Sequence, residues 1–237
     1  MDRMPTDHNP PGGISTRLVW PSADSADLPG INDYDSFAEA YAASNETNLI
    51  NAYYERPAML ALAGDVADRR ILDAGCGSGP LFAALRDRGA IVTGIDQSAG
   101  MLEQARRRLG DDVDLQVAEL GRPLPFPDDT FDDVTASLVL HYLEDWGPAL
   151  AELRRVLKPG GRLIVSVDHP FVTTLAHREA GREPDYFATY NWLDEWTVDG
   201  QTALLSFWAR PLHAMTDAFT AAGFRISVIS EPQPVWC

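Results

Sequence analysis

Hydrophobic residues between positions 70 and 167 fall into two kinds of pattern. Short, continuous apolar runs predict buried strands, and segments with apolar residues three or four positions apart predict helices. In chain order the elements are strand, helix, strand, helix, strand, strand, helix, strand. This order predicts a doubly wound, mostly parallel sheet with helices on both faces. The first expected strand ends at Leu72, and the other four span 90–96, 113–117, 134–140 and 162–167. The expected helices span about 79–88, 98–105 and 146–157.

The patterns before this region predict an extra element at the N-terminal side. Residues 1–30 are rich in proline and glycine and have no periodicity, so we expect a flexible tail. Residues 31–66 contain one helical pattern from Tyr34 and a second over about 48–62, and together they predict an N-terminal helical cap. The remaining residues, 67–237, are expected to form the main domain.

The segment after the fifth strand interrupts the alternation of strands and helices. Residues 168–209 are rich in aromatic side chains, and Asp199-Gly200 within 196–205 predicts a hairpin turn. An insertion at this position would lie over the carboxyl ends of the strands, where α/β proteins bind ligands. We interpret it as a substrate lid, with a surface for self-association as the alternative.

The C-terminal region predicts one more helix and one more strand. The helix is closed by Gly223, and the sixth strand is expected over 224–229. Too few residues follow to build another strand, so we expect the final antiparallel strand to be missing.

The segment 71–80, ILDAGCGSGP, joins the first strand of the sheet to the helix that follows it. Its glycines suit a tight turn that requires positive φ and lets a ligand approach the backbone. The third glycine of a dinucleotide fingerprint would fall on Pro80, so that fingerprint is imperfect. Asp96 ends the next strand about 20 residues later, the spacing at which a carboxylate binds ribose hydroxyls. The alternatives are a glycine turn without a ligand and an acidic helix cap.

Five features occur in an order typical of one protein family. They are the glycine loop with Asp73, then Asp96, Glu119, the turn LPFPDDTFD at 124–132, and LKPGG at 157–161. Over residues 34–234 the chain resembles the class I S-adenosylmethionine (SAM) methyltransferases that act on small molecules. The resemblance implies a Rossmann-like fold, SAM as the cofactor and S-adenosylhomocysteine as the product.

The resemblance also implies which residues form the cofactor site. Tyr41 matches an aromatic residue that often lines the pocket, and Gln97 and Met101 would lie near the ribose and the adenine. Glu119 stands where the family usually has an aspartate facing the adenine amino group, and Leu120 would pack on the adenine. The expected cofactor residues are Tyr41, Asp73, Gly75, Cys76, Gly77, Asp96, Gln97, Met101, Glu119, Leu120 and Ser137.

Methylation of a hydroxyl group benefits from a general base, and histidine is the usual base near neutral pH. His141 and His169 fall at the ends of the fourth and fifth strands, and the neighbouring Asp168 could orient His169. A packing role beside the cofactor is the alternative for His141. The residues expected to contact the acceptor are Tyr34, Tyr190, Trp192 and Trp208.

An aromatic lid favours a small organic acceptor. The sequence SLVL at 137–140 replaces the N-P-P-Y motif of the family members that methylate amino groups. We therefore expect a SAM-dependent methyltransferase that acts at oxygen, with carbon and nitrogen as alternatives. Three other functions are open: a non-methylating step such as a cyclisation, a nicotinamide oxidoreductase, and a module that only senses SAM.

The composition narrows the expected partners. The chain has 35 acidic and 19 basic residues, a formal net charge of −16, which disfavours nucleic acid. Its two cysteines, Cys76 and Cys237, give neither a disulfide framework nor a metal-binding spacing. No apolar run approaches the roughly 20 residues that span a bilayer. We expect a cytoplasmic monomer or homodimer with a small-molecule substrate, no metal, no nucleic acid and no membrane.

Overall fold

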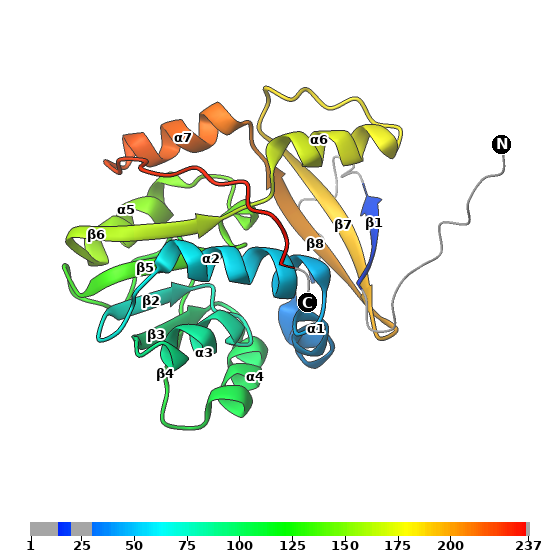
Figure 1. The fold of residues 1–237 in the computed structure, drawn as a ribbon. Helices are drawn as coiled ribbons and strands as arrows, with labels where there is room; N and C mark the ends of the chain where they lie inside the picture. Colours follow the sequence, from blue (N-terminus) through cyan, green and yellow to red (C-terminus); the bar gives the residue numbers. More distant parts are fainter. Residues whose placement is uncertain (1–13, 20–29, 236–237) are drawn as a thin grey trace.

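A five-stranded sheet forms the centre of the computed structural model, which describes residues 14–19 and 30–235 (Figure 1). All neighbouring strands in this sheet are parallel, and their order is β4-β3-β2-β5-β6. This confirms the predicted Rossmann-like, mostly parallel sheet. The strands are β2 (Arg70–Ala74), β3 (Ile91–Asp96), β4 (Asp114–Val117), β5 (Phe131–Ser137) and β6 (Leu157–Ser166).

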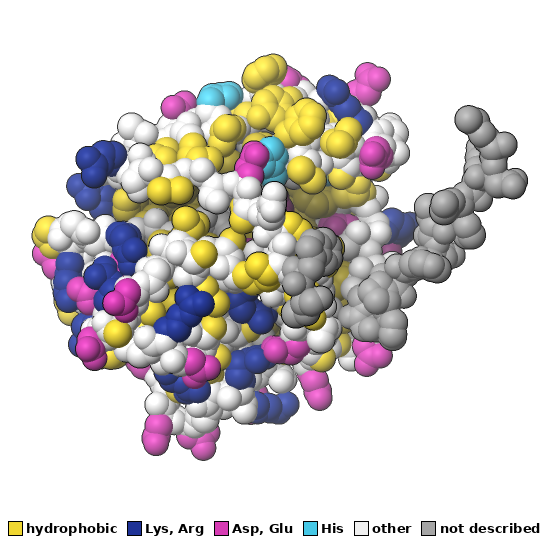
Figure 2. Space-filling view, in the orientation of Figure 1, with side chains coloured by type: hydrophobic (Ala, Val, Ile, Leu, Met, Phe, Trp, Pro, Cys, Tyr) yellow, Lys and Arg dark blue, Asp and Glu magenta, His cyan; other side chains and the backbone are white. Residues whose placement is uncertain are grey.

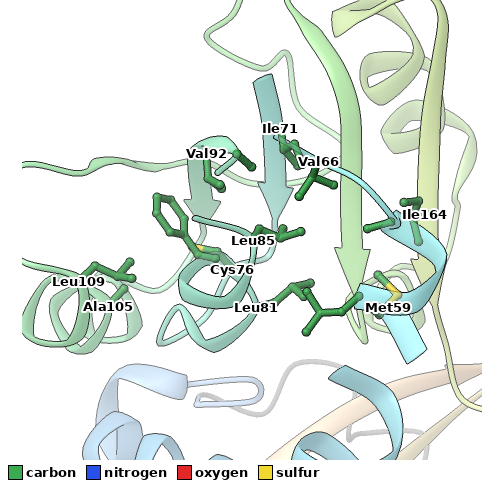
Figure 3. Packing of buried hydrophobic residues seen from close by; sticks show 14 of the residues in the cluster. Met59, Val66, Ile71, Cys76, Leu81, Leu85, Val92, Ala105, Leu109 and Ile164 are labelled. Atoms are coloured by element: carbon green, nitrogen blue, oxygen red, sulfur yellow. The ribbon is translucent and has the colours of Figure 1, made fainter. Parts of the chain in front are cut away.

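Helices cover both faces of the sheet, as predicted. Successive strand residues point to opposite faces, so Ile71 and Leu72 belong to different apolar clusters. Met59 and Leu85 pack in the cluster of Ile71 (Figure 3). The division between the N-terminal cap and the main domain at residue 67 stays a prediction. Met59, before this division, and Ile71, after it, pack in the same core cluster. One face carries α2 (Arg56–Ala63), α3 (Pro80–Asp87) and α4 (Ala99–Leu109), and the other carries α5 (Gly147–Val156) and α7 (Leu212–Ala221).

The predicted N-terminal helices are present and lie against α4. Asp35 joins the two, because its Oδ1 accepts hydrogen bonds from Ser98 Oγ at 2.6 Å and from the Gly100 amide at 2.7 Å. Ser98 in turn caps α4 by accepting a hydrogen bond from the Met101 amide at 2.9 Å. These elements are η2 (Tyr34–Phe37), α1 (Ala38–Asn45) and the π-helix η3 (Leu49–Glu55), which leads into α2.

A second, antiparallel sheet lies beside the first, with the strand order β1-β7-β8 (Figure 1). The hairpin of β7 (Tyr190–Val198) and β8 (Gln201–Ala209) confirms the predicted turn, since Asp199 and Gly200 both have positive φ, 48° and 75°. Before it the chain forms α6 (Pro170–Glu179), a helix that the sequence pattern did not predict. The role of this region as a lid stays a prediction.

The expectation of a flexible tail is wrong for part of residues 1–30. Ser15–Val19 forms β1, which pairs with β7 and is fixed at its centre by an ion pair between Arg17 and Glu195, with hydrogen bonds of 3.0 Å. A strand this short has no local signal, because its partner lies far along the chain. The rest of the expected tail, 1–13 and 20–29, lies outside the described residues.

The sixth strand expected over 224–229 is also wrong. The chain runs there without strand pairing, and Val228 and Ile229 are 62% and 65% exposed. Alternating apolar residues form a strand only where a neighbouring strand pairs with their backbone. The fourth strand starts and ends three residues earlier than expected: Phe131 pairs with Leu157 of β6, and Leu138, with φ of +48°, turns the chain at the other end.

The surface carries charges of both signs. Figure 2 shows acidic and basic side chains interspersed over the main sheet, and hydrophobic side chains gathered higher on the same face, where α6 lies. Phe171, Val172 and Leu175 of α6 are exposed there. In the described residues no helix is both long enough and apolar enough to cross a bilayer.

Candidate functional site

A cavity of about 280 Å³ opens between the N-terminal helices and the carboxyl ends of β2, β3 and β5. It brings together all the residues expected to bind the cofactor, together with Tyr34 from the set expected to contact the acceptor. Tyr190, Trp192, Trp208 and the two candidate histidines are not among its lining residues. The expected cofactor residues in the lining are Tyr41, Asp73, Gly75, Cys76, Gly77, Asp96, Gln97, Met101, Glu119, Leu120 and Ser137.

The glycine loop forms part of the cavity wall, and its first position, residue 75, has room only for glycine. Gly75 has φ of +76°, and a Cβ built on it would lie 2.6 Å from Val139 Cγ2. The amides of Gly75 and Cys76 both donate to the Ile95 carbonyl, at 2.8 and 2.9 Å, which holds the loop against the end of β3. The close approach of Val139 therefore explains the first glycine better than turn geometry alone.

Asp96 ends β3 beside this loop. Its Oδ2 accepts a hydrogen bond from the Gly77 amide and its Oδ1 accepts one from the Ser98 amide, both at 2.9 Å. Burial raises the pKa of Asp96, although these hydrogen bonds offset part of the effect. Each carboxylate oxygen has a further lone pair, so Asp96 can still accept hydrogen bonds from a ligand in the cavity.

Asp73 lies deeper in the wall and is 1% exposed. Its Oδ1 accepts a hydrogen bond from Thr135 Oγ1 at 2.8 Å, and its Oδ2 has no hydrogen-bond partner within the described residues. Burial, opposed by the Thr135 hydrogen bond and reinforced by the charges of Glu55 and Asp96, raises the pKa of Asp73 to about 7. A buried carboxylate oxygen without a donor is stabilised by a cationic ligand.

Two charged residues from the N-terminal helices were missed by the sequence analysis. Glu55 and Arg56 line the cavity, and Glu55 Oε1 accepts hydrogen bonds from Ser137 Oγ and Ser166 Oγ, both at 2.6 Å. Arg56 donates from Nη2 to the carbonyl and side-chain oxygens of Asn45, at 3.0 and 3.1 Å. Their only sequence signal is an acid–base pair within an otherwise aromatic and apolar stretch at 52–63.

Tyrosine side chains form a further part of the cavity wall. Tyr34, Tyr41 and Tyr142 line the cavity, and the hydroxyls of Tyr34 and Tyr142 hydrogen-bond to each other. Burial raises the pKa values of Tyr34 and Tyr142 well above their ordinary value, so both hydroxyls stay protonated. One of them donates to the other, and the O–H of the second is left to donate to a ligand. Trp192 and Phe207 stand behind this wall in the same aromatic cluster.

The two candidate histidines lie outside the cavity lining, and their predicted roles as general bases stay predictions. His141, 6% exposed, follows β5 and places Nδ1 3.4 Å from Asp168 Oδ2. His169 caps α6, and its Nε2 lies 2.8 Å from Glu231 Oε1. Asp168 therefore pairs with His141 and not, as expected, with His169, because β5 and β6 end side by side.

The remaining residues expected to contact the acceptor belong to the hairpin. Tyr190 hydrogen-bonds through its hydroxyl to His177 Nδ1 at 2.9 Å. Trp192 packs on Phe207 with ring centroids 4.9 Å apart. Trp208 lies opposite Asn191 in the register of the hairpin. Their contact with an acceptor also stays a prediction.

Comparisons with known proteins agree with this fold. The family model described as "Methyltransferase domain" matches residues 72–165, from β2 to β6. A crystal structure of a SAM-dependent methyltransferase from Mesorhizobium loti matches with a TM-score of 0.57 and 27% identity, over 73% of this chain and 81% of that one. Residues 72–165 therefore form a methyltransferase domain with the fold of the class I SAM-dependent methyltransferases, and SAM, the cofactor expected from the sequence, is the cofactor of those proteins.

Within this class the chain is similar to two kinds of curated relative. It is 42% identical over 134 residues to the demethylmenaquinone methyltransferase of Clavibacter sepedonicus, a match over 56% of this chain and 55% of that protein. It is 39% identical over 142 residues to a ubiquinone/menaquinone biosynthesis C-methyltransferase of Desulfotalea psychrophila, over 57% of each. The chain thus spans a little over half the length of these relatives.

Proposed function

We propose that this chain transfers a methyl group from SAM to a small organic acceptor. The observation that carries the proposal is that the glycine loop, Asp96 and Asp73 line the same cavity. One carboxylate oxygen of Asp73 has no hydrogen-bond partner within the described residues. A cavity lined by the glycine loop, together with a buried carboxylate oxygen lacking a donor, fits a nucleoside that carries positive charge. When bound, SAM supplies an activated methyl group on a sulfonium sulfur.

The lining residues would divide the recognition of SAM between them. Asp96 would accept hydrogen bonds from the ribose hydroxyls, and Leu120 would pack on the adenine. At the other end, Asp73 would face the ammonium group, and Arg56 would bind the carboxylate, since it is the one cation in the described lining. Because the methyl donor is already activated, the main tasks of the protein are to hold the acceptor in line and to exclude water.

Two features support a hydroxylated aromatic acceptor. The hydrogen-bonded pair of Tyr34 and Tyr142 hydroxyls keeps one O–H that can donate to an acceptor oxygen, and the surrounding rings offer an apolar, flat surface. The sequence favours oxygen as the methylated atom, whereas the names of the relatives favour a ring carbon of a quinone precursor. The acceptor oxygen would bind the same tyrosines in both cases.

An assay with two acceptor types tests this proposal. The purified chain is incubated with SAM carrying a labelled methyl group, and either a simple phenol or a hydroxylated naphthalene with a free ring position. Labelled product with either acceptor supports a methyltransferase, and NMR of the product assigns the methyl group to oxygen or carbon. If the chain binds SAM but methylates neither acceptor, the result would count against a hydroxylated aromatic substrate.

Loss of the Asp96 carboxylate should weaken SAM binding. We expect Asp96→Ala to cost about 1–3 kcal/mol of binding free energy, because it removes acceptors from a buried site and frees the Gly77 amide. Isothermal titration calorimetry measures the change, with Asp128→Ala, an exposed acid remote from the cavity, as the control. Unchanged affinity for SAM in Asp96→Ala would reject the proposed contact with ribose.

SAM should bind more tightly as the pH rises from about 5.5 to about 7. The pKa of Asp73 is about 7, and a cationic ligand favours the ionised carboxylate, so binding at low pH must release a proton. One released proton raises the affinity by up to about tenfold per pH unit. The window stays below the pKa of about 7.7–8.0 of an α-amino group, so that SAM keeps its ammonium charge. Titrations in two buffers of different ionisation enthalpy detect the proton, and Asp73→Asn should not release it.

A further inference from the structure

The cavity has an unbalanced set of charges. Four acids, Glu55, Asp73, Asp96 and Glu119, line it, against the single cation Arg56 in the described lining. Glu119 is largely exposed and lies 3.6 Å from Arg122, so solvent and a neighbouring charge screen it. The other three acids are buried or partly buried, and their negative charges raise one another's cost of ionisation.

Glu55 is the acid for which the proposed mechanism gives no role. It is 7% exposed, and the described residues show no ion pair to it, although the charge of Arg56 acts on it. Its Oε1 is fixed by two serine hydroxyls, Ser137 at the end of β5 and Ser166 at the end of β6. Hydrogen bonds donated by both serines stabilise the ionised carboxylate at a site where burial opposes ionisation.

Glu55 lies on the same side of the cavity as Asp73, the residue proposed to face the ammonium group of SAM. Ser137 donates to Glu55 and Thr135 donates to Asp73, and these two residues lie on the same face of β5, two positions apart. Arg56, the next residue in the chain, is available for a ligand carboxylate. Glu55 ends a π-helix, a rare conformation that is frequent at functional sites.

SAM and S-adenosylhomocysteine differ in one methyl group and one positive charge. The sulfonium of SAM is lost when the methyl group leaves, and the product sulfur is neutral. A fixed, unpaired carboxylate with low solvent exposure attracts a nearby positive charge much more strongly than an exposed one does. Contacts with adenine, ribose and the amino-acid group are the same for both molecules and give no preference.

We propose that Glu55 is a specificity-determining residue that makes this site bind SAM in preference to S-adenosylhomocysteine. This inference rests on the proposed function. The two serines hold the carboxylate in place, and its charge attracts the sulfonium cation. The loss of that cation during methyl transfer weakens the binding of the product and speeds its release.

Calorimetric titration of the full chain with three nucleosides tests the inference: SAM, S-adenosylhomocysteine, and sinefungin, in which a carbon that carries an amino group replaces the methylated sulfur. Wild type should bind SAM and sinefungin at least about tenfold more tightly than S-adenosylhomocysteine. In Glu55→Gln the affinity for both cations should fall about tenfold, and the affinity for S-adenosylhomocysteine should change less than about twofold. Retained binding of the neutral product shows that the variant is folded.

The matched control is Glu119→Gln, which removes an acid from the same cavity at its exposed end and should leave the preference unchanged. Equal weakening of all three ligands in Glu55→Gln, or a wild type that binds the product as tightly as SAM, would overturn the inference and leave the proposed function standing. A wild type that binds none of the three would overturn both. If Glu55→Gln does not fold, Ser166→Ala takes its place, because it removes one of the two donors to Glu55 from outside the cavity lining and should reduce the preference for SAM; an unchanged preference would overturn the inference.

Discussion

Replacing Gly75 with alanine is expected to abolish SAM binding at micromolar concentrations. The new Cβ would lie 2.6 and 2.9 Å from Cγ2 and Cβ of Val139, which itself lines the cavity, and the backbone φ of +76° disfavours any side chain. The left-handed conformation costs about 1–2 kcal/mol, and overpacking costs about 1–3 kcal/mol more. If the loop shifts to relieve the backbone strain and the collision with Val139, we expect the free energy of SAM binding to weaken by about 3 kcal/mol, which is more than a hundredfold in affinity.

Gly110→Ala is the matched control for this experiment. Gly110 has a similar φ of +91°, but nothing lies within 4 Å of a Cβ built on it, so only the backbone cost applies. Calorimetry of both variants with SAM, together with thermal unfolding, separates a local change in the cavity from a loss of stability. Gly75→Ala with wild-type affinity would show that SAM does not bind against this loop.

The sequence allowed the main sheet to be predicted because each of its signals is local. The glycine loop, Asp96 and the turn at 124–132 lie next to the strands they end or begin, so their order along the chain determines the topology. β1 could not be predicted in the same way. Ser15–Val19 becomes a strand only through its pairing with β7, and nothing in five residues indicates a partner nearly the whole chain away.

The candidate site was predicted in part for the same reason. Residues within or beside the glycine loop and β3 line the cavity as expected, whereas Glu55 and Arg56 come from helices whose packing over the sheet the sequence does not specify. The placement of Asp168 beside His141 depends on which strands are neighbours at their carboxyl ends. That information comes from the three-dimensional arrangement and not from spacing along the chain.

The amino-terminal edge of the sheet should be the most sensitive point for stability. Asp133 is fully buried and accepts hydrogen bonds from two arginines, Arg69 and Arg162. We expect Asp133→Ala to lower the free energy of unfolding by about 3 kcal/mol, because it removes a buried carboxylate that accepts hydrogen bonds from two partly exposed arginines. Asp128→Ala, which removes an exposed partner of Arg155, should cost less than about 1 kcal/mol. Urea unfolding at pH 7 measures both.

The same substitution should remove part of the acid sensitivity of the fold. Burial alone would raise the pKa of Asp133, but hydrogen bonds and charge from Arg162 and Arg69 outweigh it, so the folded pKa lies below the ordinary value. The stabilisation from a lowered carboxylate pKa is present above the unfolded pKa of about 3.9 and is lost as the pH falls through the folded pKa. Wild type should therefore lose more stability than Asp133→Ala between about pH 5 and pH 2. Parallel unfolding curves for the two chains over that range would show that Asp133 does not stabilise the fold through its charge.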